Sequence, residues 1–194
     1  MKNRLKKCKQ LTCFIIFLLI SCLWLSESLS GSAIKERIVT APHPVLRQRA
    51  TDIERGDHET IQLLIEMADY IEESVRPIAG ISLPQLAVSK RGFVAMIEEE
   101  AVIMINPKLM KYGQEEPSLE GCLSLPGQFG YVSRHSSVTV EYHDEDWQKQ
   151  VLHLKDIDSF VVQHENDHLD GILIADKMLA APAQSLRNSD IPLE

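Results

Sequence analysis

Cysteine is scarce in this 194-residue sequence, and its distribution excludes a disulfide framework. Only four cysteines occur, and Cys8, Cys13 and Cys22 all fall in an apolar N-terminal segment. Cys122 is the single thiol in the rest of the chain and has no partner there for a disulfide. The sequence also lacks internal repeats, a low-complexity linker and a phosphate-binding glycine loop. These absences exclude a disulfide-stabilised scaffold, a repeat protein and a P-loop nucleotide-binding protein.

Basic residues are few outside the N-terminus. The formal net charge is −8 at pH 7. Residues 1–30 contain five basic residues and one acidic residue, so the rest of the chain is more acidic than the total. Nucleic-acid binding depends largely on a basic surface that neutralises phosphates. We therefore expect no direct binding of DNA or RNA.

The N-terminus has the layout of a secretory signal peptide. Its basic residues precede a mostly apolar run of 15 residues, Leu11–Leu25, and small residues follow that run. The run is short for a membrane span, which needs about 20 residues. A cleaved targeting segment, an uncleaved anchor and a start codon chosen too far upstream all explain it. We expect residues 1–30 to be a signal-like leader and residues 31–194 to form a single domain.

The most informative motif has the pattern H-E-x-x-H and occupies residues 164–168. On a helix, residues four apart share a face, so His164 and His168 can reach one metal ion. Glu165 follows the first histidine, where it can act on a water molecule at the metal without binding the metal itself. This arrangement is typical of metal-dependent hydrolases.

A helix through this motif is supported by the residues around it. Asp156 or Asp158 can cap its N-terminus, and Gly171 follows its last turn, where a left-handed residue is favoured. Helical spacing also predicts a buried stripe made of Ile157, Phe160, Val161, His164 and His168.

A catalytic site of this kind needs a third ligand and an open position. Downstream of the motif the only glutamate is Glu194, and position 174, where some zinc peptidases carry a third histidine, is Ile174. The third ligand must then come from upstream. Cys122, in the segment E-G-C-L-S at residues 120–124, is the best candidate, although a single cysteine is often only a small buried residue.

These motifs resemble those of the peptide deformylase family. The family is marked by the segments G-x-G-Φ-A-A-x-Q, E-G-C-Φ-S and H-E-x-D-H, in that order. The second and third are complete in this sequence, at residues 120–124 and 164–168. The first is altered at residues 78–85: Gly80 and Gln85 are retained, but Ile78 replaces a glycine and Ser82-Leu83 replace two alanines. The resemblance covers about residues 36–178.

The resemblance implies a reaction, a cofactor and a site. The reaction is hydrolytic removal of the formyl group from N-formylmethionine of newly made polypeptides. The implied cofactor is one divalent metal ion, Fe(II), with Zn(II) compatible with the same ligands. The implied metal ligands are Cys122, His164 and His168. Glu165 would be the general base, and the Gln85 side-chain amide and the Leu123 backbone N–H would stabilise the oxyanion.

The resemblance also implies how substrate is bound. In the family, the strand of the first motif pairs with the peptide. The implied substrate-binding residues are Gly80, Ile81, Glu120 and Gly121. Ile78 and Leu83 add bulk, which either packs into the core or narrows the cleft and lowers activity. Glu120 and Arg134 have opposite charges and could pair to hold the Cys122 segment.

For the fold, the resemblance implies an α+β domain in which mixed, mostly antiparallel strands surround the central helix with the H-E-x-x-H motif. The residues themselves predict an amphipathic helix over residues 57–75, with an apolar face of Ile61, Leu64, Ile65, Ala68, Ile71 and Val75. Short strands are expected at residues 93–97, 101–105, 137–142 and 150–154, with a hairpin turn at 143–149.

The expected partners are N-formylmethionyl peptides or nascent chains, at a site close to the ribosome, and we expect a monomer. This activity predicts a cytoplasmic location, whereas the leader predicts a membrane-associated or exported protein. Two alternative functions stay open. One is an exported metallopeptidase, and the other is a deformylase-like protein that binds peptide or metal with weak or no turnover.

Overall fold

The computed structural model describes residues 33–179, so the leader expected at residues 1–30 lies outside the described part of the chain. Five antiparallel strands form one sheet in chain order, β1-β2-β3-β4-β5. The elements are η1 (Pro44–Arg47), α2 (His58–Glu72), β1 (Gly80–Ser82), η2 (Leu83–Leu86), β2 (Gly92–Ile97), β3 (Glu100–Cys122), β4 (Leu125–His143), β5 (Lys149–Lys155), α3 (Asp156–Leu169) and η3 (Ile174–Asp176). Between residues 33 and 179, none of the helices combines the length and apolar character needed to cross a membrane.

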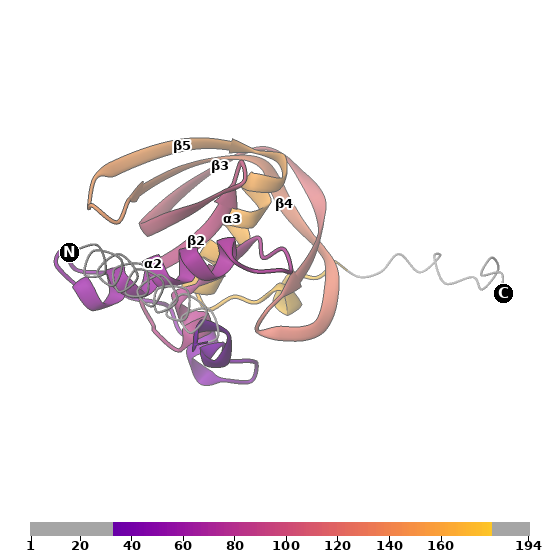
Figure 1. The fold of residues 1–194 in the computed structure, drawn as a ribbon. Coiled ribbons are helices and arrows are strands. Elements are labelled where there is room, and N and C mark those ends of the chain that lie inside the picture. Colours follow the sequence, from indigo (N-terminus) through magenta and orange to yellow (C-terminus); the bar gives the residue numbers. More distant parts are fainter. Residues whose placement is uncertain (1–32, 180–194) are drawn as a thin grey trace, which may run out of the picture.

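Helix α3, which carries the H-E-x-x-H motif, is the centre of the fold. It contacts all five strands, and Figure 1 shows β3, β4 and β5 curving over it. Successive residues of β2 point to opposite faces, so Phe93 packs with Val162 of α3, whereas Val94 packs with Leu64 of α2. The α+β fold with a central helix is confirmed. Parallel pairing is limited, within residues 33–179, to one isolated bridge between Thr51 and Lys90.

Helix α2 forms largely as its sequence predicts. Asp57 caps it, since its side chain accepts a hydrogen bond from the Thr60 backbone N–H at 3.2 Å. Leu64 and Ile71 are buried against the sheet as expected. The helix ends at Glu72, however, so the expectation for Val75 is wrong: its side chain is fully exposed. The apolar face also includes Met67, which the sequence analysis did not place there.

The start and the apolar face of α3 differ from expectation. Neither Asp156 nor Asp158 caps the helix; the N-cap is Lys155, the last residue of β5, and it makes no side-chain capping bond. The expected buried stripe is wrong at its first residue, because Ile157 is 71% exposed. Burial on α3 instead centres on Val162 and Leu169. The end of the helix is as expected, with Gly171 in the left-handed region at φ +73°.

The sheet extends much further than the four short strands predicted from the sequence. All four exist, and the hairpin at residues 143–149 joins β4 to β5 as expected. Strands β3 and β4, however, pair over most of their length through several register shifts. Residues 111–117 of β3 are exposed and mostly polar, so they carry no alternating pattern that would reveal a strand. The long pairing matters because it ends at the turn that carries Cys122.

Candidate active site

Three potential metal ligands converge from two parts of the fold. Cys122 is the last residue of β3, directly before the two-residue turn that leads into β4. His164 and His168 lie one turn apart on α3. One ligand atom from each of the three residues lies within 4.8 Å of the other two, and Cys122 Sγ is 3.4 Å from His168 Nε2. A tetrahedral centre with usual bond lengths places a thiolate and an imidazole nitrogen about 3.6 Å apart, so the donor set fits a divalent metal.

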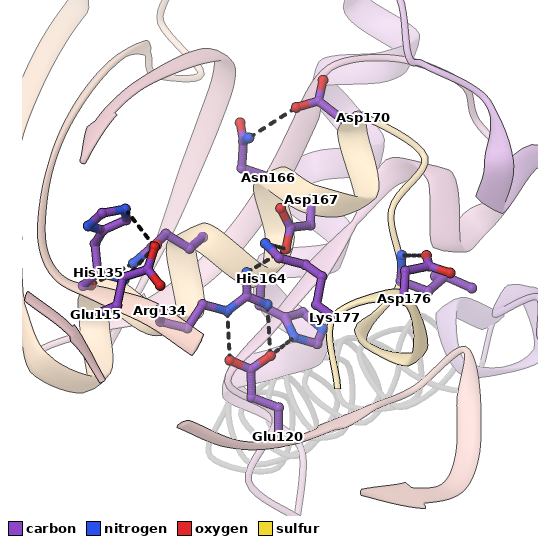
Figure 2. A network of polar contacts seen from close by, with 12 residues as sticks. Glu115, Glu120, Arg134, His135, His164, Asn166, Asp167, Asp170, Asp176 and Lys177 are labelled. Carbon is purple, nitrogen blue, oxygen red and sulfur yellow. Dashed lines mark hydrogen bonds and ion pairs between the residues drawn. The ribbon is translucent and has the colours of Figure 1, made fainter. Parts of the chain in front are cut away.

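The orientation of His164 is set by a buried ionic network. His164 Nδ1 lies 2.8 Å from Glu120 Oε2, which leaves Nε2 for a metal. Arg134 holds Glu120 in two places, through Nε to Oε1 and Nη2 to Oε2, both at 2.8 Å. Arg134 also donates to Asp167, which receives a second hydrogen bond from Lys177. Figure 2 shows Arg134 between the two carboxylates, and its side chain is only 1% exposed.

The electrostatics of the two histidines differ because of this network. Burial opposes the charge of His164, but its hydrogen bonds with Cys122 and Glu120 outweigh burial and raise its pKa to about 10. Burial and the charge of His164 together lower the pKa of His168 to about 3. The two histidines therefore share one positive charge, which lies on His164, and protonation of His168 as well is unfavourable. A metal ion binding to both imidazoles would displace the proton on His164.

Glu165 lies beside the ligands in a dry environment. It is 3% exposed, and burial raises the pKa of its carboxyl group to about 7. Among residues 33–179, nothing donates a hydrogen bond to its Oε2 atom. Gly80 lies directly against it: a Cβ atom on Gly80 would be 2.6 Å from Glu165 Oε1. Glycine at this position is therefore what allows the carboxylate to occupy its place.

Gln85 is held with its amide N–H₂ group toward the ligands. Its Oε1 atom accepts hydrogen bonds from the Ser82 backbone N–H at 2.9 Å and the Ser82 hydroxyl at 3.1 Å. This leaves Nε2 to face Cys122 Sγ at 3.7 Å. The backbone of residues 39–41 ties Gln85 to the Cys122 turn, since Val39 N–H donates to Gln85 O and Ala41 N–H to Ser124 O. Leu123 lies in that same turn.

A cleft of about 800 Å³ opens onto these residues. Its walls include Gly80, Gly121 and Glu120 from the expected substrate-binding residues. The Ile81 side chain is buried in the cluster packed against α2, so it does not line the cleft. Phe129 lies flat over Gly121, where a Cβ atom would be 2.5 Å from its ring. Phe129 is 72% exposed and forms part of the wall.

The cleft explains why part of the predicted buried stripe of α3 is exposed. The part of α3 that lines the cleft comprises Ile157, Phe160, Val161, His164 and Glu165. Helical spacing identified a real apolar face, but Ile157 and Phe160 of that face line the cleft, whereas Val161 both lines the cleft and packs against the core. The two bulky residues of the altered first motif lie in different environments. Leu83 is fully buried in the core, whereas Ile78 lines the cleft.

The sequence identifies the three candidate metal ligands, the general base Glu165 and the Glu120–Arg134 ion pair. It does not reveal that further charged residues join this ion pair in a buried network. Asp167 and Lys177 were not singled out, although Asp167 belongs to the motif itself. Its position three residues after His164 places it on a neighbouring face of α3, which was the available signal. Lys177 carries no such signal, because it lies in none of the motifs and nothing in the sequence around it shows that the chain turns back toward Asp167.

Comparisons with known proteins agree with this geometry. A family model described as polypeptide deformylase matches residues 35–183. The peptide deformylase of Cytophaga hutchinsonii is 31% identical over an alignment of 159 positions, which covers 77% of this chain and 85% of the relative. That of Carboxydothermus hydrogenoformans is 36% identical over 143 residues, 73% of this chain and 91% of the relative.

Solved structures are similar over the same part of the chain. The crystal structure of peptide deformylase from Thermotoga maritima has a TM-score of 0.68 and 30% identity, and the match covers 74% of this chain and 97% of that one. Plasmodium falciparum peptide deformylase, in complex with an inhibitor, has a TM-score of 0.64 and 38% identity over 73% of this chain and 88% of that one. The family match includes both complete motifs and all five strands.

Proposed function

Because this chain belongs to the peptide deformylase family, we propose that Cys122, His164 and His168 hold its metal ion and that Glu165 is its general base. Peptide deformylases are metal-dependent hydrolases that remove the formyl group from the N-terminal formylmethionine of new polypeptides, and this protein is one of them. The observation that carries the residue assignment is the convergence of one thiolate and two imidazoles beside a buried, unpartnered carboxylate oxygen.

The reaction adds water across the formyl amide and yields formate and a free amine. When bound, the divalent metal acts as a Lewis acid that lowers the pKa of water and polarises the formyl carbonyl group. Glu165 accepts the proton of the attacking water and returns it to the departing amine. Its raised pKa suits this exchange, because a base that must later act as an acid works best with a pKa near the operating pH. Gly80 lies directly against the Glu165 carboxylate, which lines the cleft where the water would attack.

Negative charge develops on the formyl oxygen as water attacks. We assign its stabilisation to Gln85 Nε2 and the Leu123 backbone N–H. The Ser82 contacts support this role, because they fix the Gln85 amide with its donor toward the ligands before substrate arrives. We assign Glu120 to orienting His164 rather than to contacting substrate, since both of its oxygens are engaged within the protein. We assign Gly80 and Gly121 to binding the substrate backbone along the cleft wall that they line.

The metal is proposed to be Fe(II), with Zn(II) as the alternative. One thiolate and two imidazoles accept either ion. A thiolate beside Fe(II) is sensitive to oxygen. We therefore expect protein purified without oxygen to contain iron and to lose activity in air, whereas a zinc enzyme would keep its activity. Metal analysis of the same sample before and after exposure to air distinguishes the two.

The activity is tested by measuring formate release from formyl-Met-Ala-Ser with anaerobically purified, Fe(II)-loaded protein. We expect turnover that requires stoichiometric metal, and no release of formate from the metal-free protein. An acetylated peptide serves as the control, because the extra methyl group should be rejected. Stoichiometric metal without formate release would instead favour the deformylase-like binding protein.

Ile78 should limit the rate, and Leu83 should not. Ile78 lines the cleft where the family has glycine, so Ile78→Gly is expected to raise kcat/KM on formyl-Met peptides several-fold by widening the cleft. Leu83 is fully buried, and Leu83→Ala should instead cost about 2–5 kcal/mol of stability through the cavity it leaves. Kinetics and urea unfolding of the two single variants separate these effects. An unchanged kcat/KM in Ile78→Gly would show that the altered motif does not restrict activity.

The setting of the reaction is also a proposal. We propose a monomer that acts on nascent chains close to the ribosome. Two locations are proposed as alternatives. The activity favours the cytoplasm, whereas residues 1–30 would direct the protein to a membrane as an anchor or out of the cytoplasm as a cleaved leader. N-terminal sequencing and fractionation of cells that make the full-length chain test the second alternative, and recovery of intact protein in the cytosol would contradict it.

A further inference from the structure

The segment after α3 returns to the sheet and places one lysine at the metal site. Met178 forms an isolated bridge with Val132 of β4, and the Leu179 backbone N–H donates to Tyr131 O at 2.8 Å. Gly130 makes room for this segment, because a Cβ atom there would be 2.8 Å from the Met178 side chain. As a result, Lys177 points inward and its Nζ atom lies 2.7 Å from Asp167 Oδ2.

Lys177 supplies the second positive charge of the buried network. Glu120 and Asp167 are two carboxylates with little exposure, and Arg134 touches both of them. When His164 is a neutral metal ligand, Arg134 alone would leave these two carboxylates with one excess negative charge. The side chain of Lys177 is 30% exposed, so it balances that charge from the edge of the protein. Figure 2 shows the resulting chain of contacts from Lys177 through Asp167 and Arg134 to Glu120 and His164.

The two carboxylates share one guanidinium group, and its position decides how His164 is held. The Nε and Nη2 atoms of Arg134 must stay on Glu120 for Glu120 Oε2 to stay on His164 Nδ1. An Asp167 with no other cation would attract Arg134 more strongly. A second cation on Asp167 reduces that pull. Partners that orient a ligating histidine typically change metal affinity when they are lost.

We propose that Lys177 is a positioning residue for the metal site, which acts through Asp167, Arg134 and Glu120 to keep His164 oriented for its metal. The proposal rests on the proposed function only in that His164 is a metal ligand. It assigns a role in metal retention to a residue that contacts neither the metal ligands nor the cleft. An ordinary ion pair at the protein surface would have no such effect.

The test compares Lys177→Met with Lys177→Arg and with a matched control, Lys149→Met. Lys149 also pairs with one carboxylate, at 2.9 Å from Glu141 Oε2, but on the surface and away from the site. The measurement is the rate of zinc loss from full-length, zinc-loaded protein to a chromogenic chelator at pH 7, together with the visible absorption of the Co(II)-substituted protein. Lys177→Gln serves as a second neutral variant if Lys177→Met does not fold.

We expect zinc loss to be about 3–10 times faster in Lys177→Met, below the 10–100-fold typical of direct partners because the effect passes through three residues. The Co(II) spectrum should shift, Lys177→Arg should restore both properties, and Lys149→Met should match the wild type. The proposal would be overturned if Lys177→Met released zinc at the wild-type rate and kept the wild-type Co(II) spectrum. This holds even if the variant were less thermally stable, because a purely structural role would give that result. A wild-type protein without stoichiometric metal would overturn the metal site as well, which separates the two failures.

Discussion

Glu165→Gln is expected to lower kcat by about 10²–10⁴-fold while leaving one metal ion bound per chain. The amide has nearly the shape of the carboxylate, so Gly80 can accommodate it, but it cannot accept the proton of the attacking water. Cys122, His164 and His168 are unchanged, which is why metal content should not fall. Formate release and metal analysis on the same preparation test both halves of the prediction.

If Glu165→Gln lost activity because it unfolded, its thermal stability would fall. Burial raises the pKa of Glu165 from its unfolded value of 4.5 to about 7, so this group costs the metal-free protein stability as pH rises above 4.5, and the cost is complete above about 7. Replacing it with a neutral amide should therefore leave the thermal stability of the metal-free protein equal or higher. Glu59→Gln, at an exposed position on α2, is the matched control and should keep full activity. Turnover by Glu165→Gln close to that of wild type would exclude Glu165 as the base.

Arg134→Met is expected to have the largest effect on stability, a loss of about 3–5 kcal/mol in the free energy of unfolding at pH 7. The guanidinium group is fully buried and makes hydrogen bonds to both Glu120 and Asp167. Its removal leaves Glu120 with only His164 and Asp167 with only Lys177. Urea unfolding measures the loss, and Arg49→Met, whose side chain is 83% exposed, should change stability little.

The cost of Arg134→Met should depend on pH. Burial opposes ionisation of Glu120, but the hydrogen bonds of Arg134 outweigh burial and lower its pKa to about 2. A lowered carboxyl pKa stabilises the folded state above the unfolded pKa, near 4.5, and that stabilisation is lost as pH falls toward 2. In the variant this stabilisation is smaller, because Glu120 keeps only its contact with His164 while burial still opposes its charge. The difference between the two proteins should therefore be largest near pH 7 and shrink as pH falls toward 4, and a pH-independent difference would contradict this account.

The parts of the site that the sequence revealed are those in which neighbouring residues act together. H-E-x-x-H brings two ligands and a base onto one stretch of α3, and E-G-C-L-S places Cys122 at the end of β3, directly before a two-residue turn. Each motif can therefore be recognised from neighbouring residues alone. The match to the peptide deformylase family supports a deformylase and not the exported metallopeptidase that the signal-like leader suggested. Lys177 could not be predicted, because its role depends on how the chain after α3 returns to β4.

Helices and strands could be predicted from the sequence where apolar residues recur at a regular spacing, but not where a strand is exposed. Helix α2 follows its apolar spacing up to Glu72, whereas Val75 continues the spacing without continuing the helix. The spacing of Ile157, Phe160 and Val161 is real but cannot say whether an apolar face meets a core or a cleft. Residues 111–117 of β3 are exposed and mostly polar, and they form a strand by pairing with β4 rather than by burying one face.

The separation of the ligands along the chain has a consequence for how the protein holds together. Cys122 and His168 are 46 residues apart, and the intervening chain contains β4, β5 and most of α3. A metal bound by both would close that loop, much as a covalent cross-link does, and would restrict the unfolded chain if it stayed bound there. Because the complete ligand set exists only in the folded protein, metal binding also adds directly to the free energy of unfolding. A strong chelator should therefore act on this enzyme as a mild denaturant, loosening the central helix from the sheet.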